Sequence, residues 1–92
     1  MTGTERIAAE RKRQIDVEGW TAEHDDKHTN GELVEAAATY AYQALGSRVP
    51  AIALWPWDLC SWKPSENPVR NLEKAGALIA AEIDRLQRIE NE

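Results

Sequence analysis

Cysteine is almost absent from the sequence, since Cys60 is the only one among 92 residues. A single thiol excludes an intramolecular disulfide framework and suits a reducing compartment. The chain also has no apolar segment near its N-terminus and no long apolar span elsewhere. We therefore expect neither secretion nor membrane insertion, and we predict a cytoplasmic location.

Positive charge is also scarce. The formal net charge is −5 and the isoelectric point is near 5.0. This balance argues against binding of nucleic-acid polymers or anionic membranes. It is compatible with binding of a small anionic ligand, because one local basic cluster can hold such a ligand.

The chain is short, and its length predicts one domain spanning residues 1–92 with a small core. Disulfides cannot supplement that core, so we expect a homo-oligomer. The sequence has no Gly-rich phosphate loop, no Ser/His/Asp order and no base partner specific to Cys60, and so gives no signal for covalent catalysis. We therefore expect neither an enzyme nor a cofactor.

Helix signals occur three times along the chain. Thr2 and Glu5 fit a capping box at the start of a helix that runs to about residue 17 or 18. A second capping box, Thr29 to Glu32, predicts a helix over residues 30–45. Asn67 followed by Pro68 is a typical N-cap and first-turn pair, and it predicts a third helix to near residue 89. The expected fold is all-α, with three helices and two long loops at residues 19–30 and 46–67.

The third helix carries a predicted core face. Apolar and small residues recur on one side of it, namely Leu72, Ala75, Gly76, Ile79, Ile83 and Leu86. Gly76 in the middle of a helix is costly, so we predict a close helix crossing there. The last two turns are a candidate contact with another subunit.

Polar residues are concentrated between Glu18 and His28. His24 and His28 have the spacing that places two imidazoles on one face of a helix, as in zinc sites. The glutamate that a zinc protease carries after its first histidine is missing, and no third ligand is evident. We therefore predict no metal, and favour histidines that hydrogen-bond to Asp25, Asp26 or loop carbonyls.

Four acidic residues suggest a second metal hypothesis. Glu32 and Glu35, with Glu82 and Asp84, are similar to the paired acidic motifs of all-α nucleotide pyrophosphohydrolases that bind Mg²⁺. The spacing of Glu82 and Asp84 does not place both carboxylates on one helix face. Glu32 also has a predicted capping role. A Mg²⁺-dependent nucleotide hydrolase is thus an alternative to simple binding.

Tryptophans and cations gather in the second half of the chain. Trp55, Trp57 and Trp62 share one polar stretch that Lys63 follows, and Arg70 and Lys74 come soon after. Aromatic faces stack on a base and cations hold phosphates, so the pattern indicates a nucleotide pocket. The alternative is that the tryptophans form the core. Arg11 has two interpretations as well: its stem covers the core, or its head binds an anion.

Several motifs resemble a widespread group of small phage and prophage proteins. They include Glu18-Gly-Trp-Thr-Ala-Glu-His-Asp-Asp-Lys-His28, Gly31-Glu-Leu33, Trp55-Pro-Trp57, Trp62-Lys-Pro64 and Lys74-Ala-Gly-Ala-Leu-Ile79. The likeness covers most of the chain and implies a source more than a function. A phage protein of this kind would act in the cytoplasm of the host cell.

The chain is also distantly similar to the ryanodine-receptor repeat (RyR) domain. The similarity lies in Gly19-Trp20, Asp26, His28, the tryptophan loop and Arg70 before a helix. It implies a pocket formed by Trp20, Asp26, His28 and Arg70. RyR-like modules have been suggested to bind nucleotide-derived ligands in bacterial conflict systems. The chain departs from that domain by having a helix where the domain is shorter and richer in proline.

Together these features are similar to those of phage sponges, which are typically homo-oligomers that sequester an immune nucleotide. We predict binding, without cleavage, of a cyclic ADP-ribose-like or cyclic dinucleotide messenger. Trp20 and a tryptophan of residues 55–62 would stack on the base, Arg11, Lys63 and Arg70 would hold phosphates, and Asp26 with His28 would bind ribose. The predicted ligand-binding residues are Arg11, Trp20, His24, Asp26, His28, Trp55, Trp57, Trp62, Lys63 and Arg70. The alternatives are the hydrolase and a protein inhibitor of a host enzyme.

Overall fold

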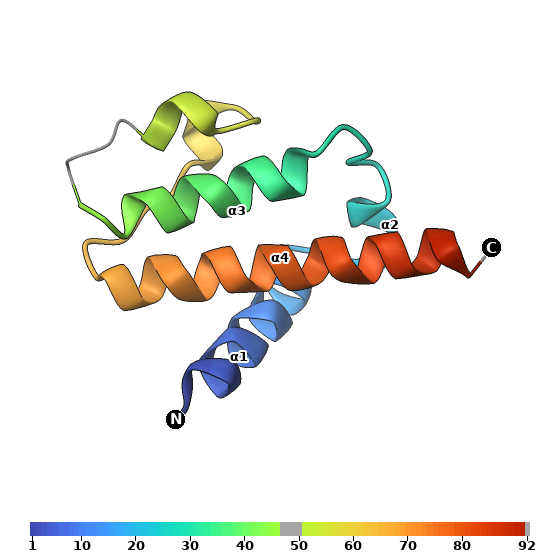
Figure 1. The fold of residues 1–92 in the computed structure, drawn as a ribbon, viewed down its shortest axis with the longest axis horizontal. Helices are drawn as coiled ribbons and strands as arrows, with labels where there is room; N and C mark the ends of the chain where they lie inside the picture. The colour runs from blue at the N-terminus through green and yellow to red at the C-terminus, as the bar shows by residue number, and fades with distance from the viewer. Residues whose placement is uncertain (47–50, 92) are drawn as a thin grey trace.

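The other α-helices pack against one long helix, α4 (Figure 1). The computed structural model describes residues 1–46 and 51–91. Its α-helices are α1 (Gly3–Asp16), α2 (Ala22–Asp25), α3 (Glu32–Gln43) and α4 (Pro68–Glu90), with 3₁₀ turns η1 (Ala51–Leu54) and η2 (Leu59–Ser61) between α3 and α4. These ranges contain no strand, which confirms the all-α class.

The predicted count of three helices misses α2, a single turn within the expected first loop. Thr21 starts this turn, because its hydroxyl accepts a hydrogen bond from the backbone N–H of His24 at 3.4 Å. The turn buries Asp25, which is 1% exposed. A four-residue helix has no apolar periodicity, so the sequence pattern could not distinguish it from a loop.

Two of the predicted helix starts are confirmed. The backbone N–H of Thr2 donates to the Glu5 carboxylate at 2.9 Å, and that of Glu5 donates to the Thr2 hydroxyl at 3.2 Å. Asn67 accepts from the backbone N–H of Val69 at 2.9 Å, directly before the α4 turn that Pro68 begins. Both caps form between residues that lie only two or three positions apart in the sequence.

The predicted start of the second helix is wrong. The residue before α3 is Gly31, whose φ of 82° lies in the left-handed region that glycine favours. The Glu32 carboxylate accepts instead from the backbone N–H of Asn30 at 2.6 Å. Because the chain turns at Gly31, Thr29 cannot cap the helix, and α3 begins two residues later than predicted.

The apolar core lies between α3 and α4. It is built from small side chains, a few large ones and one tryptophan of the connecting segment: Leu33, Ala36, Ala37, Tyr40, Trp55, Ala75, Leu78 and Ala81. Alanines on both helices permit a close approach, and the gap left along the edge is filled by Tyr40 and Trp55.

The predicted core face of the last helix is largely wrong. Leu72, Ile79, Ile83 and Leu86 are each about half exposed, whereas the buried face of α4 consists of Asn71, Ala75, Ala77, Leu78, Ala81, Glu82 and Arg85. The reason is the partner helix: α3 presents alanines, and a close approach requires small residues on α4 as well. The larger apolar residues remain on the outside.

Helix α1 crosses α4 at Gly76. A Cβ atom added to Gly76 would lie 2.6 Å from Cδ1 of Ile7, so only glycine allows this approach. The prediction of a close helix crossing at Gly76 is therefore confirmed. Figure 1 shows α1 running obliquely across the middle of α4. The residues that α1 buries are polar, namely Glu10 and Gln14.

The segment between α3 and α4 folds back over the core. The indole N–H of Trp55 donates to the backbone oxygen of Asp58 at 3.1 Å and to the hydroxyl of Ser61 at 3.2 Å. Asn71 anchors the end of the segment through two 2.8 Å hydrogen bonds to the backbone of Ser65. Residues 47–50 of the predicted second loop lie outside the described residues. None of the helices described has the length and apolar character needed to cross a bilayer.

Candidate functional site

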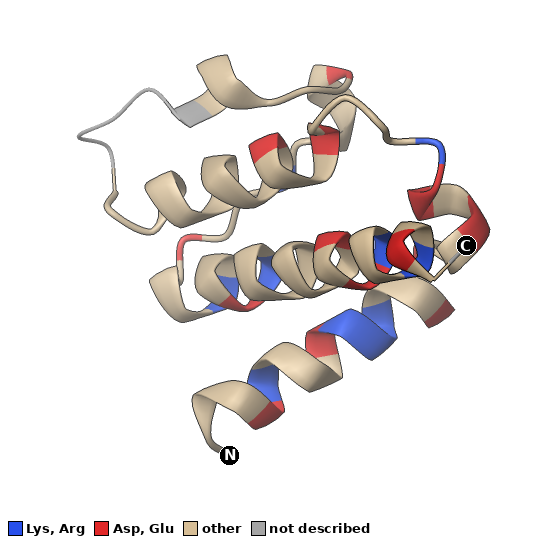
Figure 2. Cartoon of the chain, turned by 45° about the vertical axis from the view of Figure 1, so that its right-hand side comes forward, with Lys and Arg blue, Asp and Glu red and all other residues tan. Residues whose placement is uncertain are grey.

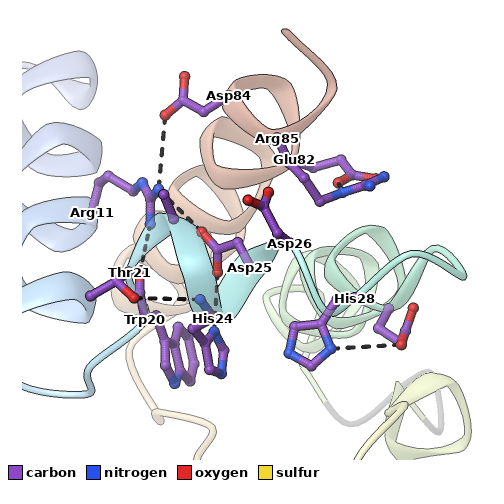
Figure 3. A network of polar contacts seen from close by, with 12 residues as sticks. Arg11, Trp20, Thr21, His24, Asp25, Asp26, His28, Glu82, Asp84 and Arg85 are labelled. Atoms are coloured by element: carbon purple, nitrogen blue, oxygen red, sulfur yellow. Dashed lines mark hydrogen bonds and ion pairs between the residues drawn. The ribbon is translucent and has the colours of Figure 1, made fainter. Parts of the chain in front are cut away.

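A buried ion pair fixes the helical turn α2 against α1. Arg11 is held by Asp25, with 3.3 Å between its Nη2 and the Asp25 Oδ2, and it also donates to the backbone oxygen of Trp20 at 3.4 Å (Figure 3). The side chain of Asp25 is 1% exposed, and Arg11 is the cation that contacts it. The contacts of Arg11 with Asp25 and with the backbone of Trp20 thereby fix the position of the residues that follow Gly19.

Each histidine of this turn faces a carboxylate through the same ring nitrogen. Nδ1 of His24 lies 3.2 Å from Oδ1 of Asp25, and Nδ1 of His28 lies 3.6 Å from Oε2 of Glu32 (Figure 3). These contacts favour a proton on Nδ1 in both rings. Nε2 of each imidazole is then the nitrogen that can bind another partner.

The two histidines line a pocket of about 260 Å³ that we call the aromatic pocket. Its walls are Trp20, His24, His28, Trp57, Asp58, Cys60 and Ser61. The rings of Trp20 and His24 are nearly parallel, with centroids 6.0 Å apart, and His28 lies 5.0 Å from Trp57. The pocket thus offers flat faces together with imidazole nitrogens and a carboxylate.

A second pocket, of about 270 Å³, lies beside the first, and we call it the cationic pocket. Its walls come from α1, α3, α4 and the segment before α4: Glu10, Arg13, Gln14, Glu18, Trp20, Tyr40, Ser61, Lys63, Arg70 and Lys74. Four cations and two carboxylates give this lining a surplus of two positive charges. Figure 2 shows lysines and arginines along α1 and α4, whereas α3 carries neither.

Glu10 organises the cationic pocket. Its carboxylate is 3% exposed and accepts hydrogen bonds from Arg13 at 2.8 and 3.0 Å and from Gln14 at 3.1 Å. It also pairs with Arg70 at 2.6 Å. Burial by itself would raise the pKa of Glu10, but the bonds from Arg13 and Arg70 outweigh it and hold the pKa below its ordinary value. Glu10 therefore stays ionised and fixes both guanidinium groups.

Lys74, like Lys63, is a cation of this pocket for which the described residues provide no carboxylate within ion-pair distance. Its Nζ donates to the backbone oxygen of Lys63 at 2.7 Å and lies 5.3 Å from the centre of the Tyr40 ring. Burial, with a further contribution from the charge of Arg70, lowers the pKa of Lys74. Burial also raises the pKa of Tyr40, so the phenol remains neutral. An anion in the pocket would relieve the repulsion between Lys74 and the arginines.

Gln14 leaves one buried atom without a partner. Its side chain is 1% exposed and its amide N–H donates to Glu10, while Oε1 accepts no hydrogen bond from the described residues. A buried acceptor without a donor costs about 1–3 kcal/mol. Gln14 lines the cationic pocket, but Oε1 itself exposes less than 1 Å², so a donor in the pocket reaches this atom only after the Gln14 side chain moves.

The structure brings together six of the ten predicted ligand-binding residues. Trp20, His24, His28 and Trp57 line the aromatic pocket, whereas Lys63 and Arg70 line the cationic pocket together with Trp20. The RyR-derived set is therefore spread over both pockets, except for Asp26.

The other four predicted residues lie outside the two linings. Asp26 pairs with Arg88 of α4 at 2.8 Å, and Arg11 pairs with Asp25. Trp55 is a core residue that contacts Tyr40 edge to face, and Trp62 packs beside both rings. Their roles in the structure are contacts within the chain.

Sequence reasoning missed the polar floor of the cationic pocket. Glu10 and Gln14 are spaced to share one side of α1, with Arg13 next to them. Their spacing on the helix was a visible signal, but polar residues on a short helix ordinarily face solvent. Only the position of α1 across α4 turns them inward.

Three of the four carboxylates of the alternative Mg²⁺ hypothesis have separate contacts. Glu82 pairs with Arg85 at 2.5 Å, Glu32 lies near His28, and Asp84 lies 3.8 Å from Arg11. Within residues 1–46 and 51–91, no three His, Cys, Asp or Glu side chains gather in a way that could hold a metal ion.

Comparison with known proteins found no matching family model, no matching curated protein and no matching solved structure.

Proposed function

We propose that this protein binds a small nucleotide-derived ligand, of the cyclic ADP-ribose or cyclic dinucleotide class, and sequesters it without cleaving it. One observation carries the proposal: the aromatic and cationic pockets share two walls, Trp20 and Ser61. A ligand with a flat base and a negatively charged phosphate needs these two environments side by side.

The base is assigned to the aromatic pocket. Trp20 and Trp57 supply aromatic surface where they line this pocket, although one face of Trp20 lies against His24. Stacking of a base on an aromatic ring contributes about 1–3 kcal/mol per base. Nε2 of His24 and His28 can accept from, or donate to, hydroxyl groups of a ribose. The pocket alone, at about 260 Å³, is near the lower limit for ligand sites, but the two pockets together lie within the usual range.

The phosphate is assigned to the cationic pocket. Lys63 and Lys74 supply ammonium groups, and Arg70 supplies a guanidinium whose orientation Glu10 fixes. Once the Gln14 side chain moves, a hydroxyl or amine of the ligand can donate to its orphan Oε1. The pocket therefore suits a ligand that carries both an anion and a hydrogen-bond donor.

Sequestration agrees with the resemblance to phage and prophage proteins. A protein of this kind would lower the free concentration of a host immune messenger, which requires tight binding and no turnover. The histidines, each oriented by a carboxylate, serve in this proposal as hydrogen-bond partners for ribose.

The direct test is depletion followed by release. Purified protein is incubated with a panel of cyclic ADP-ribose isomers and cyclic dinucleotides, the free nucleotide is measured by chromatography, and the protein is then denatured by heat. We expect one class to disappear and to return intact. Return of an altered product would make the protein an enzyme, and absence of depletion would favour inhibition of a host protein.

Cys60 gives a second readout that needs no variant. It is the only cysteine, it is exposed, and it lines the aromatic pocket. A ligand bound there should slow its reaction with a thiol reagent such as dithiobisnitrobenzoate. An unchanged rate at saturating ligand would place the ligand elsewhere.

Variants assign the two halves of the ligand. Trp20→Ala should remain folded and lose binding, because Trp20 lines both pockets. Lys74→Gln should weaken binding about tenfold, which matches the loss of one charged hydrogen bond. Lys12→Gln is the matched control, because the Lys12 side chain is 77% exposed and lies outside both linings. Equal affinities of the two lysine variants would remove Lys74 from the site.

A further inference from the structure

The face of α4 turned away from α1 and α3 is apolar and exposed. Its central residues are Leu72, Ile79, Ile83 and Leu86, with exposed fractions between 45% and 51%, and we call these four the α4 stripe. Val69 and Ile89, 46% and 52% exposed, lie at its edges. No residue of the stripe lines the aromatic or the cationic pocket.

The spacing of the stripe is that of a helix–helix seam. Leu72, Ile79 and Leu86 recur every seven residues, and Ile83 lies between the last two at the three-to-four spacing of a coiled coil. A seam of this kind is made to face another helix. The elements described here leave it uncovered, since α3 and α1 occupy the other sides of α4.

We infer that the stripe binds a second copy of this chain, with the two α4 helices antiparallel and Ile79 at the two-fold axis. In this register Leu72 of each copy meets Leu86 of the other, because both lie seven residues from Ile79. By the same count Ile83 of one copy lies level with Ala75 of the other and one residue from Gly76, where the helix has no side chain of its own and Ile7 is the neighbour. The pattern is therefore self-complementary, as a two-fold interface requires.

A groove at the N-terminal end of the α4 stripe can accept side chains from the C-terminal end of the stripe in the second copy. A nearly apolar groove of about 170 Å³ lies between the N-terminal turns of α1 and α4, lined by Gly3, Arg6, Ile7, Val69, Leu72 and Glu73. In the antiparallel register this groove faces the last turns of the second α4, which carry Leu86 and Ile89. An apolar side chain from those turns can fill it.

Charge favours the antiparallel direction. Arg6 lies beside the start of the stripe, where it pairs with Glu73 at 3.3 Å and keeps its side chain 47% exposed, and Glu90 lies at the end of the same face. An antiparallel pair brings Arg6 of one copy toward Glu90 of the other and opposes the two helix dipoles. A parallel pair would bring Arg6 to Arg6 and Glu90 to Glu90.

The exposed area matches a dimer of moderate strength. Six side chains that are each about half exposed present on the order of 500 Å², compared with roughly 800 Å² per partner in an ordinary stable complex. Ile7, Arg6 and Glu90 at the rim add to this area. It is also as large as the largest apolar patch expected on a monomer, about 300–600 Å².

Site-directed cross-linking tests both the partner and the register. In a Cys60→Ser background, which removes the native thiol, Ile79→Cys should form a covalent dimer with a short bismaleimide. Leu72→Cys alone should not, because in the antiparallel register the two copies of residue 72 are roughly 21 Å apart along the helices. A mixture of the separate Leu72→Cys and Leu86→Cys proteins should cross-link. Efficient cross-linking of Leu72→Cys by itself would overturn the antiparallel arrangement.

Sedimentation tests the interface without cysteines. Wild-type protein should show a mass that rises to that of a dimer with concentration, and Ile83→Lys should remain a monomer with an unchanged circular dichroism spectrum. Val34→Lys is the matched control, because Val34 on α3 is exposed to a similar extent, 53% against 51%. A monomeric wild-type protein at every concentration would overturn the proposal and assign the stripe to a different partner.

Discussion

The two helices that pack on α4 do so with opposite chemistry. Helix α3 buries Leu33, Ala36, Ala37 and Tyr40, whereas the two residues that α1 buries are Glu10 and Gln14. The α3 interface resembles an ordinary apolar core. The α1 interface is an ion-pair network with one unsatisfied atom, and it forms the wall of the cationic pocket.

We expect the α3 interface to contribute mainly to stability and the α1 interface mainly to the proposed ligand binding. Apolar burial at the α3 interface is favourable in itself, at about 25 cal/mol per Å². Burial of charged groups at the α1 interface contributes little net stability to the fold, even when the charges are paired. In the proposed function this polar interface serves as part of the phosphate site.

The largest expected effect is at the α3 interface. Leu78 is fully buried, and Leu78→Ala should lower the free energy of unfolding by about 3–5 kcal/mol because it opens a cavity in the small core. Leu45→Ala makes the same chemical change at a residue that is 61% exposed and should cost less than about 1 kcal/mol. Urea denaturation of both variants measures the contrast. Similar losses would contradict the placement of the core.

The next effect is at the α1 interface and depends on pH. Glu10→Gln leaves Arg13 and Arg70 without their shared carboxylate, and it should cost about 1–3 kcal/mol near pH 7, since both guanidinium groups are partly solvated. Because the pKa of Glu10 in the folded protein lies below 4.5, the unfolded chain binds more protons in acid. Wild-type stability from Glu10 is thus present above pH 4.5 and lost as the pH falls through the lowered pKa.

Denaturation curves between pH 7 and pH 3 test this assignment. The difference in stability between the wild type and Glu10→Gln should shrink as the pH decreases. A difference that stays constant with pH would show that Glu10 contributes through packing and not through its charge.

A smaller effect is expected where α1 crosses α4. Gly76→Ala places a Cβ 2.6 Å from Ile7 Cδ1, an overlap that costs about 1–3 kcal/mol. The gain in helix propensity, about 1 kcal/mol, offsets part of it. Thermal denaturation should show a net loss. Ile7→Ala removes the three atoms that the added Cβ would meet, so the double variant should lose less stability than the sum of the two single variants. Strict additivity would argue against the contact.

The smallest effect on stability, with a larger one on binding, is expected at Gln14. Gln14→Met keeps the length of the side chain, removes the orphan acceptor and also removes the hydrogen bond to Glu10. The two changes oppose each other, so stability should change by less than about 1 kcal/mol. Affinity for the ligand should fall, because the ligand loses its acceptor. Calorimetry and thermal shift together measure this; unchanged affinity would leave Gln14 without a role in binding.

The sequence predicted a site of polar and aromatic residues, but not how these residues are divided between the two pockets and the core. Trp55 belongs to the buried core, whereas Trp20, Trp57 and Trp62 are partly buried and pack against it. Of these three, Trp20 and Trp57 also line the aromatic pocket, although all four were predicted to bind the ligand. A tryptophan has the same sequence signal in both roles. Which role it takes depends on whether the segment that carries it lies over α3 or at the edge of α2.

Local interactions are what the sequence determined by itself. The capping box of Thr2 and Glu5, the Asn67-Pro68 start of α4 and the glycines after α1 and α3 act between residues a few positions apart, so they are visible in the sequence. The all-α class follows from these signals and from helical periodicity.

Only the tertiary structure decided which faces are buried. On α4 the strongest apolar periodicity belongs to the exposed stripe, while the buried face is rich in alanine because α3 approaches closely with alanines of its own. On α1 the crossing at Gly76 turns Glu10 and Gln14 inward. Burial is a property of two surfaces together, and a single sequence displays each surface without its partner.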